Sequence, residues 1–245
     1  MRRILTALTI IAMALNASAQ VSSRISTRTG IVNQLKTFGR VSYRGINYYP
    51  AGKDSLLLQR DIINKSDSVL LIPELKIDGK PHVVSGFKSS AFERDLDLKY
   101  IGIPKNFTTV SNSCFYECHR LTECEMPSIK QILGYAFFRT GFNHLVLHEG
   151  LEYIGNNAYQ ECSQLEYLEL PSTLKRIDDN AFLGCERLDT VKVNFSQPIE
   201  LGSDVFWLYR PNAERKKKTL LVPAGSKSAF EAHKEWQLFQ SIIEY

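Results

Sequence analysis

The stretch IGNNAYQECSQLEYLELPSTLKRI, residues 154–177, decides the fold of this chain because its pattern returns along the sequence. Ile154 opens the stretch, and a small residue followed by an aromatic one, Ala158 and Tyr159, comes four residues later. Ile177 then opens the next copy. Counted on the aromatic residue, successive copies are 22 to 24 residues apart. A fixed period of this length indicates a stack of similar structural units.

Six copies share this opening and several later positions. The small–aromatic pairs are Ala91-Phe92, Cys114-Phe115, Ala136-Phe137, Ala158-Tyr159, Ala181-Phe182 and Val205-Phe206. Three residues after the aromatic, three copies have a cysteine (Cys118, Cys162 and Cys185), and six residues after it four copies have a leucine (Leu98, Leu121, Leu165 and Leu188). One unit cannot bury its apolar side alone, whereas stacked units bury it against each other. We therefore expect the aromatic residues to form one column in a shared core.

The second half of each unit alternates apolar and polar residues, which predicts a strand with one buried face. The buried positions are Ile101/Ile103, Cys124/Met126, Leu168/Leu170, Val191/Val193 and, in the third unit, which is one residue shorter, Leu145/Leu147. A proline often follows, as at Pro104, Pro127 and Pro171, and ends the strand because it cannot donate to a ladder. Successive strands should pair about 4.8 Å apart in a parallel sheet. The small–aromatic segment predicts a single turn or a short 3₁₀ piece.

These residues resemble the BspA-type leucine-rich repeat of bacterial surface proteins, whose pattern is I-x-x-x-A-F-x-x-C-x-x-L-x-x-[VI]-x-[IL]-P-x-x-[VL]-x-x-I. The departures are Asp95 and Thr140 in the cysteine position, His148 in the proline position, and a last unit that keeps only its opening at Leu201. The resemblance implies a β-rich α/β solenoid, a right-handed leucine-rich-repeat superhelix with a parallel β-sheet, a β-rich N-terminal cap and a short C-terminal helix. Family members are typically exported, displayed at the cell surface and associated with adhesion and protein binding.

The first 19 residues have the form of a secretory signal peptide. Arg2 and Arg3 precede an apolar run over residues 4–14, and Ala17-Ser-Ala19 forms an A-x-A cleavage site. The run is shorter than the about 20 residues that span a bilayer. The residue directly after the cleavage site is Gln20 and not a cysteine, so the sequence gives no sign of a lipid anchor there, and the sequence beyond it has no apolar stretch of membrane length. We expect cleavage after Ala19 and export to the periplasm, the outer surface or the medium, with an uncleaved anchor as the alternative.

The rest of the chain divides by pattern into four segments. Residues 20–40 form a polar leader, residues 41–86 a β-rich N-terminal cap, residues 87–219 the six repeats, and residues 220–245 the C-terminal cap. Both ends of a solenoid need caps, because an open unit exposes apolar core. Ser226 is the candidate N-cap of the closing helix.

The charge of the chain is close to balanced. The formal net charge of +4 falls to +2 without Arg2 and Arg3. This balance does not suggest nucleic acid as a partner. The one basic run, residues 215–218, is interpreted as a solvated loop, with a patch that attracts an acidic surface as the alternative.

The five cysteines all fall on repeat positions, so the sequence does not require a metal. Cys114, Cys118, His119 and Cys124 superficially suggest a zinc site. Each of these cysteines takes a position that other units fill with a residue of the core, where free cysteine acts as a small apolar residue. Cys162 and Cys185 lie in equivalent positions of adjacent units. Their Cα separation could suit a disulfide, but parallel Cβ vectors favour free thiols.

The sequence contains no recognisable catalytic motif. The five histidines are His82, His119, His144, His148 and His233. None of them lies in a G-x-S-x-G or H-E-x-x-H motif, and no glycine-rich phosphate loop is present. We therefore predict no catalytic residue, no cofactor and no metal ion.

The residues between the buried strand positions predict an exposed surface. These partner-binding candidates are Tyr100, Glu123, Glu125, His144, Val146, Tyr167, Glu169, Thr190 and Lys192, with Gly102 beside them. Tyrosine favours protein interfaces, because it offers a large contact area with few rotors. The alternative is a merely solvated sheet face. His144 with Glu123 or Glu125 could also bind a metal weakly or make binding sensitive to pH.

The sequence therefore predicts an exported, non-enzymatic protein that binds another protein or a cell-surface ligand through its exposed sheet face. One alternative is a structural component of an envelope assembly. Another is a carbohydrate-active or other enzyme subunit. The identity of the ligand and the oligomeric state do not follow from a repeat fold.

Overall fold

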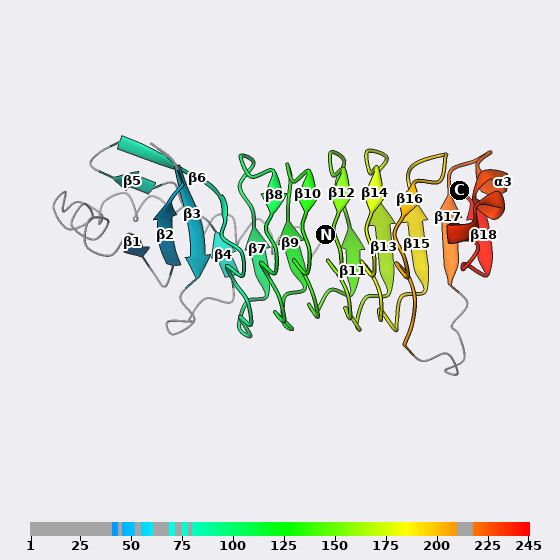
Figure 1. The fold of residues 1–245 in the computed structure, drawn as a ribbon, viewed down its shortest axis with the longest axis horizontal. Coiled ribbons are helices and arrows are strands. Elements are labelled where there is room, and N and C mark those ends of the chain that lie inside the picture. The colour runs from blue at the N-terminus through cyan, green and yellow to red at the C-terminus, as the bar shows by residue number, and fades with distance from the viewer. Residues whose placement is uncertain are drawn as a thin grey trace, which may run out of the picture.

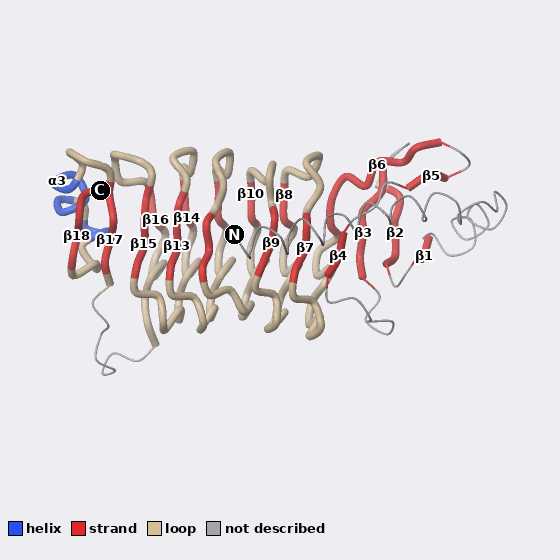
Figure 2. The backbone as a smooth tube through the Cα atoms, turned by 180° about the vertical axis from the view of Figure 1, so that it is seen from behind, coloured by secondary structure: helices blue, strands red, loops and turns tan. Residues whose placement is uncertain are grey.

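The computed structural model is an elongated solenoid in which the strands lie side by side along the long axis (Figure 1). It describes residues 41–43, 46–51, 55–60, 69–71, 75–77, 80–209 and 218–245. The predicted signal peptide and leader, residues 1–40, lie outside the described residues, as do residues 215–217 of the basic run. Each unit makes one rung, which consists of a front strand, a shorter second strand and a turn (Figure 2).

The front strands of the rungs pair in parallel, as the repeat predicts. They form a three-stranded sheet of β4 (Val69–Leu71), β7 (Tyr100–Gly102) and β9 (Glu123–Glu125). A five-stranded sheet continues with β11 (His144–Val146), β13 (Tyr167–Leu170), β15 (Thr190–Val193), β17 (Thr219–Val222) and β18 (Ser241–Glu244). The buried positions of the repeat point from these strands into the core.

A second parallel sheet, which the sequence pattern did not reveal, covers another side of the solenoid. Its two-residue strands are β8 (Thr109–Val110), β10 (Gln131–Ile132), β12 (Tyr153–Ile154), β14 (Arg176–Ile177) and β16 (Glu200–Leu201). The apolar residue that opens each repeat lies in these strands and is buried, as at Val110 and Ile132. A strand of two residues is too short to show an alternation of apolar and polar residues, so the sequence pattern does not predict it.

A small sheet stands at the N-terminal end of the solenoid. Its strands, in spatial order, are β1 (Val41–Tyr43), β2 (Ile46–Pro50), β3 (Ser55–Arg60), β6 (Lys80–Phe87) and β5 (Leu75–Ile77). The buried Leu56 and Leu58 of β3 join the same core as the repeats. This sheet therefore covers the first rung.

Helix α3 (Lys227–Ala232) and the 3₁₀ helix η1 (Lys234–Trp236) close the other end, where Phe230 and Trp236 are buried. Ser226 is the N-cap residue of α3, but its side chain makes no capping hydrogen bond. Its hydroxyl donates to the carbonyl of Pro223 instead (2.5 Å). The carboxylate of Glu244 accepts the Lys227 N–H (2.9 Å) and so occupies the start of the helix from the neighbouring strand β18.

The aromatic residues form the predicted column through the core. Phe92, Phe115, Phe137, Tyr159, Phe182 and Phe206 stack with ring centroids 5.1–5.6 Å apart and interplanar angles of 1–13°. All six side chains are buried. The prediction is confirmed, and the column includes Phe206 because the sixth unit keeps its opening.

The turns that carry this column depart from regular helix. The first five turns each have two residues with positive φ four positions apart, such as Ser113 and Glu117, whereas the sixth has Asp204 alone. The non-glycine examples lie between 53° and 59°. Left-handed backbone costs a non-glycine residue about 1–2 kcal/mol. In return, alternate N–H groups point along the axis: Ser113, Phe115 and Glu117 donate to Gly134, Ala136 and Phe138 of the next rung (2.7–2.9 Å). The strained backbone is therefore what hydrogen-bonds one turn to the next.

The cysteine position has a polar task in addition to packing. The thiols of Cys118, Cys162 and Cys185 donate to the carbonyls of Phe92, Phe137 and Tyr159 in the preceding rung (3.0–3.3 Å). All five cysteines are free thiols. Burial raises the pKa of the Cys114 and Cys185 thiols well above the usual value. Cys118, Cys162 and Cys185 are therefore structural hydrogen-bond donors in the core.

The front sheet is interrupted between β9 and β11, whereas the repeat alone predicts one continuous sheet. The third unit has one residue fewer between its aromatic residue and its strand. Its chain crosses close to the preceding rung at Gly141, whose N–H donates to Leu121 (3.0 Å), and a Cβ there would lie 2.4 Å from the His119 carbonyl oxygen. Next to the interruption, Cys124 is partly exposed, although the corresponding Ile101 and Leu168 are fully buried.

Asp95 departs from the cysteine pattern because it pairs with the N-terminal cap. Its carboxylate lies 2.6 Å from the Arg60 guanidinium, with both side chains at most 5% exposed. The other carboxylate oxygen accepts the N–H groups of Asp97 and Leu98 (3.2 and 3.3 Å). No repeat precedes this rung, so the position binds the strand β3 of the cap instead of an aromatic carbonyl.

Phe137→Ala should lower the free energy of unfolding by about 3–5 kcal/mol, because it leaves a cavity between two stacked rings. Chemical denaturation followed by circular dichroism measures this loss. Ser163→Ala, an exposed position on the following rung, is the control and should change it by less than about 0.5 kcal/mol. An unchanged stability of the Phe137 variant would contradict the stacked core.

Asp95→Cys should destabilise the protein even though cysteine is the residue that other rungs use. It removes one partner of a buried ion pair, which typically costs about 3–5 kcal/mol. Thermal unfolding compares this variant with Thr140→Cys. That control introduces the cysteine of the repeat pattern at the equivalent position two rungs later. A Tm loss that is no larger for Asp95→Cys would refute the role given to the ion pair.

Candidate functional site

The register of the front strands arranges the outward side chains in two rows, which together we call the front face. On the five-stranded sheet the first row is His144, Tyr167, Thr190, Thr219 and Ser241, and the second row is Val146, Glu169, Lys192, Leu221 and Ile243. On the three-stranded sheet, Tyr100 lies beside Glu123, and Gly102 beside Glu125. Parallel pairing without offset places equivalent residues of successive repeats next to each other.

The predicted binding residues all belong to the front face, but the interruption separates them into two groups. Tyr100, Glu123 and Glu125 lie on the three-stranded part, and the other six lie on the five-stranded part. Glu123, Glu125, His144 and Val146 are exposed. Tyr100, Tyr167, Glu169, Thr190 and Lys192 are partly buried by their neighbours. The front face therefore has an acidic N-terminal part and a mixed C-terminal part.

His144 and Tyr167 form an aromatic pair at the start of the five-stranded part. Their rings lie 4.3 Å apart between centroids with an interplanar angle of 29°. Val146, in the row beside them, is 56% exposed. Stacked rings and a bare aliphatic side chain form a firm apolar contact area, because neither ring can rotate freely without losing the other.

Glu169 is the centre of the polar contacts on the five-stranded part. Its carboxylate accepts hydrogen bonds from Lys192 Nζ, Asn194 Nδ2 and the Tyr167 hydroxyl, each at 3.0 Å. Partial burial would raise its pKa, but the hydrogen bonds from Asn194, Lys192 and Tyr167 outweigh burial and hold the pKa of Glu169 below its usual value. Burial and the bond to Glu169 raise the pKa of Tyr167 to about 12. At neutral pH, Glu169 therefore keeps its charge and Tyr167 keeps its proton, so the hydrogen bonds among Glu169, Tyr167, Lys192 and Asn194 are maintained.

Four residues that the sequence reading missed complete this part of the front face: Asn194, Leu221, Ile243 and Tyr245. The Tyr245 hydroxyl donates to Asn194 Oδ1 (2.7 Å) and lies 3.0 Å from the Val193 carbonyl oxygen. Lys192 Nζ lies 4.7 Å from the centroid of the Tyr245 ring. Ile243 is 49% exposed. The sequences TLLV and SIIE form the strands β17 and β18. Their pattern could have predicted further front strands, but they lie beyond the last recognisable repeat.

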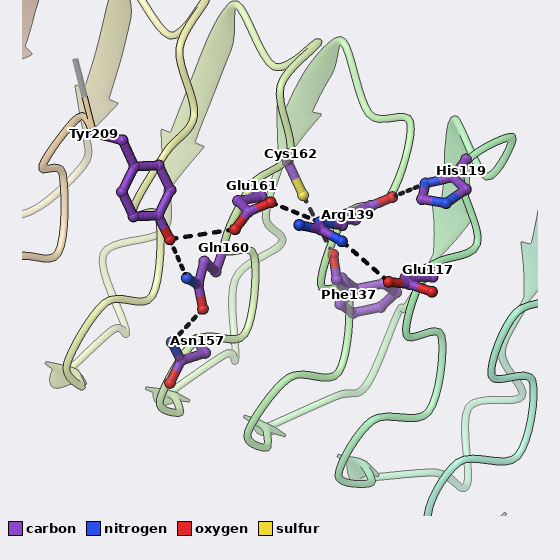
Figure 3. A network of polar contacts seen from close by, with 9 residues as sticks. All are labelled: Glu117, His119, Phe137, Arg139, Asn157, Gln160, Glu161, Cys162 and Tyr209. Atoms are coloured by element: carbon purple, nitrogen blue, oxygen red, sulfur yellow. Dashed lines mark hydrogen bonds and ion pairs between the residues drawn. The ribbon is translucent and has the colours of Figure 1, made fainter.

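The turns carry a second ordered surface, a ladder of alternating charges at the second positive-φ position of the first four turns. Arg139 reaches Glu161 (2.6 Å) on one side and Glu117 (3.2 Å) on the other (Figure 3). Arg94 pairs with Glu117 from the rung before (2.8 Å). Partial burial would raise the pKa of Glu117, but the guanidiniums of Arg94 and Arg139 outweigh this effect and lower the pKa. Because every charge has an opposite neighbour, the ladder holds rungs together and offers little free charge to a ligand.

The charge ladder ends at Gly184, and the ring of Tyr209 packs over this glycine. The Tyr209 hydroxyl contacts Gln160 and Glu161, two rungs earlier in the sequence (Figure 3). Between them lies Gly184 with φ of 73°, where a Cβ would come within 2.6 Å of the Tyr209 ring. The glycine therefore provides both the left-handed turn and the room for the ring.

Among the described residues, no group of three or more His, Cys, Asp or Glu side chains is placed to hold a metal ion. The cysteines of the apparent zinc motif lie in separate core positions, and His119 is exposed with its ring bonded to the Arg139 carbonyl (2.9 Å). Across the described ranges, no helix is both long and apolar enough to cross a membrane.

Comparison with protein families identifies the repeat. Six copies of the BspA type leucine rich repeat region match residues 85–209, half of the chain. The chain therefore belongs to the BspA-type leucine-rich-repeat family. No curated protein sequence matches it.

Solved structures show the same fold at low identity. The chain is similar to a leucine-rich-repeat protein of T. pallidum with a TM-score of 0.51 and 20% identity, over 68% of this chain and 87% of that one. It is similar to the pneumococcal vaccine antigen PcpA with a TM-score of 0.57 and 18% identity, over 77% of this chain and 51% of the antigen. The chain thus covers about half the length of the antigen, and the likeness concerns the fold alone.

Glu169→Gln should reduce stability at neutral pH, and the loss should shrink as the pH falls. The folded pKa of Glu169 is depressed, so its charge stabilises the fold above the unfolded pKa of about 4.3, and this contribution disappears as the pH falls through the folded pKa. Urea denaturation at about pH 7 and about pH 3 measures both differences. Glu186→Gln is the control, since Glu186 makes no ion pair with a described residue. A loss that is equal at both pH values would contradict the assignment.

Proposed function

We propose that this protein is an exported, non-enzymatic binding protein that recognises another protein through its front face. The observation that carries the proposal is the pair of registered rows on β11, β13, β15, β17 and β18, where exposed Val146, Ile243 and Tyr245 surround a locked polar group. Membership of a leucine-rich-repeat family supports a role in binding. A protein ligand, rather than nucleic acid, suits this mixture of aliphatic, aromatic and balanced charged groups.

The front face is suited to binding because it is rigid before contact. The strands β13, β15 and β17 are paired on both sides. Lys192, Asn194 and Tyr167 already hold Glu169 in place, and Tyr245 holds Asn194. Side chains that are ordered in advance lose little entropy when a partner docks. The exposed apolar groups supply contact area, and the polar group excludes partners that leave its hydrogen bonds unmatched.

The remaining parts of the proposal concern export and chemistry. The form of residues 1–19, with a cleavage site at Ala19, supports export through a signal peptide, and the vaccine antigen among the structural neighbours is compatible with it. The absence of catalysis rests on the typical behaviour of the family and on histidines that belong to turns and strands. The segment boundaries at residues 40, 86 and 219 remain predictions from the repeat pattern.

The triple variant His144→Ser, Val146→Ser and Ile243→Ser should weaken partner binding at least about tenfold, because interface energy concentrates in a few central side chains. The exported chain is first used to capture binders from bacterial envelope and host surface proteins. The affinity of the recovered partner is then measured by surface plasmon resonance for both chains. The Tm should stay within a few degrees, since all three side chains are exposed or face solvent.

Tyr135→Ser, Trp207→Ser and Leu238→Ser form the matched control. These side chains are 42%, 52% and 44% exposed, and Tyr135 takes a position that holds serine in the first two rungs. The control should bind normally. Normal binding by the front-face variant together with loss in the control would place the binding site elsewhere.

A further inference from the structure

The front sheet ends at β18 with an open edge. Strand β18 lies at the end of the solenoid and pairs with β17, and with no other described strand (Figure 1). Ile243 of β18 is 49% exposed. Leu221, its neighbour on β17, has a strand on each side and is partly buried. The far side of Ile243 is therefore not covered by the described part of the chain.

The hydrogen-bond pattern shows which backbone groups of β18 face the open edge. The N–H of Tyr245 donates to the carbonyl of Val222 on β17 (3.0 Å). Successive residues of a strand direct their N–H and C=O groups to opposite sides. Ile243 therefore also bonds to β17, whereas the N–H and C=O groups of Ile242 and Glu244 point to the open edge, where no other described segment bonds to them. Such a row of groups is a template for another strand.

The edge lacks the features that usually prevent strand pairing, which are lysine, proline, a bulge or a covering helix. Residues 241–245 contain neither lysine nor proline, and β18 pairs with β17 without a shift in register. The Glu244 side chain, which alternation places on the face opposite Ile243, accepts the N–H of Lys227 (2.9 Å). Helix α3 therefore approaches β18 from the rear face. On the front face, Ile243 and Tyr245 are both about half exposed.

We propose that β18 pairs antiparallel with β18 of a second copy of this chain. A twofold axis between the two Ile243 residues places Ile242 of each copy opposite Glu244 of the other, and each such pair exchanges two backbone hydrogen bonds. No other register of the two strands pairs both outward residues of both copies. The two Ile243 side chains then meet on the front face, in the kind of pair whose Cα atoms lie about 4.5 Å apart.

Charge and self-complementarity favour a second copy over a foreign strand. A twofold interface uses the same surface on both sides, so each copy supplies the apolar residue that covers Ile243 of the other. Residues 218–245 are neutral and do not repel a second copy, since they hold three lysines and three glutamates: Lys218, Lys227, Lys234, Glu231, Glu235 and Glu244. A standard interface uses about 20–30 residues a side, whereas β18 has four. The dimer is therefore weak and dissociates on dilution.

Pairing at β18 joins two five-stranded front sheets into one. Because the twofold axis is perpendicular to the joined sheet, both front faces lie on the same side of the dimer. If the front face binds as proposed above, two faces on one side give avidity for a partner that is itself repeated on a surface. The pairing itself does not rest on that function, and it is measured without any partner.

Analytical ultracentrifugation of residues 20–245, from about 1 µM to about 1 mM, should show a monomer–dimer equilibrium. Ile243→Lys should raise the dimer Kd at least about tenfold, because like charges directly opposite each other are destabilising. Val146→Lys is the matched control: it adds the same charge at an exposed aliphatic residue of the same row and should leave the Kd unchanged. A chain that is monomeric at every concentration, or an Ile243 variant that dimerises normally, would overturn the proposal.

Opposite charges at residue 243 test the twofold register. Chains with Ile243→Glu should dimerise as poorly as chains with Ile243→Lys. An equimolar mixture of the two should associate more tightly than either alone, because the axis places the two side chains opposite each other. Circular dichroism and the Tm confirm that both variants fold. A mixture that associates no more tightly than its components would overturn the register.

Hydrogen exchange of backbone amides, followed by nuclear magnetic resonance, locates the contact at the strand edge. The amides of Ile242 and Glu244 should exchange severalfold more slowly as the protein concentration rises into the range of the dimer. The amides of Ile243 and Tyr245, which already bond to β17, should show no such dependence. A dimer that forms without slowing exchange at Ile242 and Glu244 would use another surface and would overturn pairing through β18.

Discussion

The structure depends on one contact that repeats five times, the stacking of each turn on the next. The aromatic rings meet at 5.1–5.6 Å, and the alternate N–H groups of the turn donate to carbonyls of the following rung. These bonds require left-handed backbone at non-glycine residues such as Glu117 and Arg139. The strain is tolerated because a buried N–H without a partner costs comparable free energy. The turns therefore set the spacing to which both sheets conform.

Local departures from the repeat have local structural reasons. Asp95 replaces cysteine where the rung meets the cap, and there it binds Arg60. The missing residue of the third unit interrupts the front sheet without interrupting the column, because Phe115, Phe137 and Tyr159 stay stacked. Gly184 replaces a charged residue where Tyr209 crosses the turn. The stacking tolerates these changes since each rung contacts only its neighbours.

The charge ladder on the turns and the front face differ in the side chains that they leave available to a binding partner. On the turns, Arg94, Glu117, Arg139 and Glu161 neutralise each other, so the ladder contributes to rung order more than to recognition. On the front face, Glu169 is satisfied internally, whereas Glu123 and Glu125 have no described cation. Exposed Val146 and Ile243 lie in the same row as Glu169. A surface with unmatched groups on a rigid sheet is the better candidate for a partner.

The sequence by itself determined the period, the aromatic column, the buried strand positions and the outward direction of the nine front-face residues, because these depend on side-chain alternation and on burial within one repeat. Only the tertiary structure decided the second sheet, the interruption between β9 and β11, the ion pair of Asp95, and the hydrogen bonds that link Tyr245 to Asn194 and Asn194 to Glu169. Those features arise from contacts between residues 22 to 51 positions apart in the chain. No local pattern encodes such contacts, since they form only when the rungs close on one another.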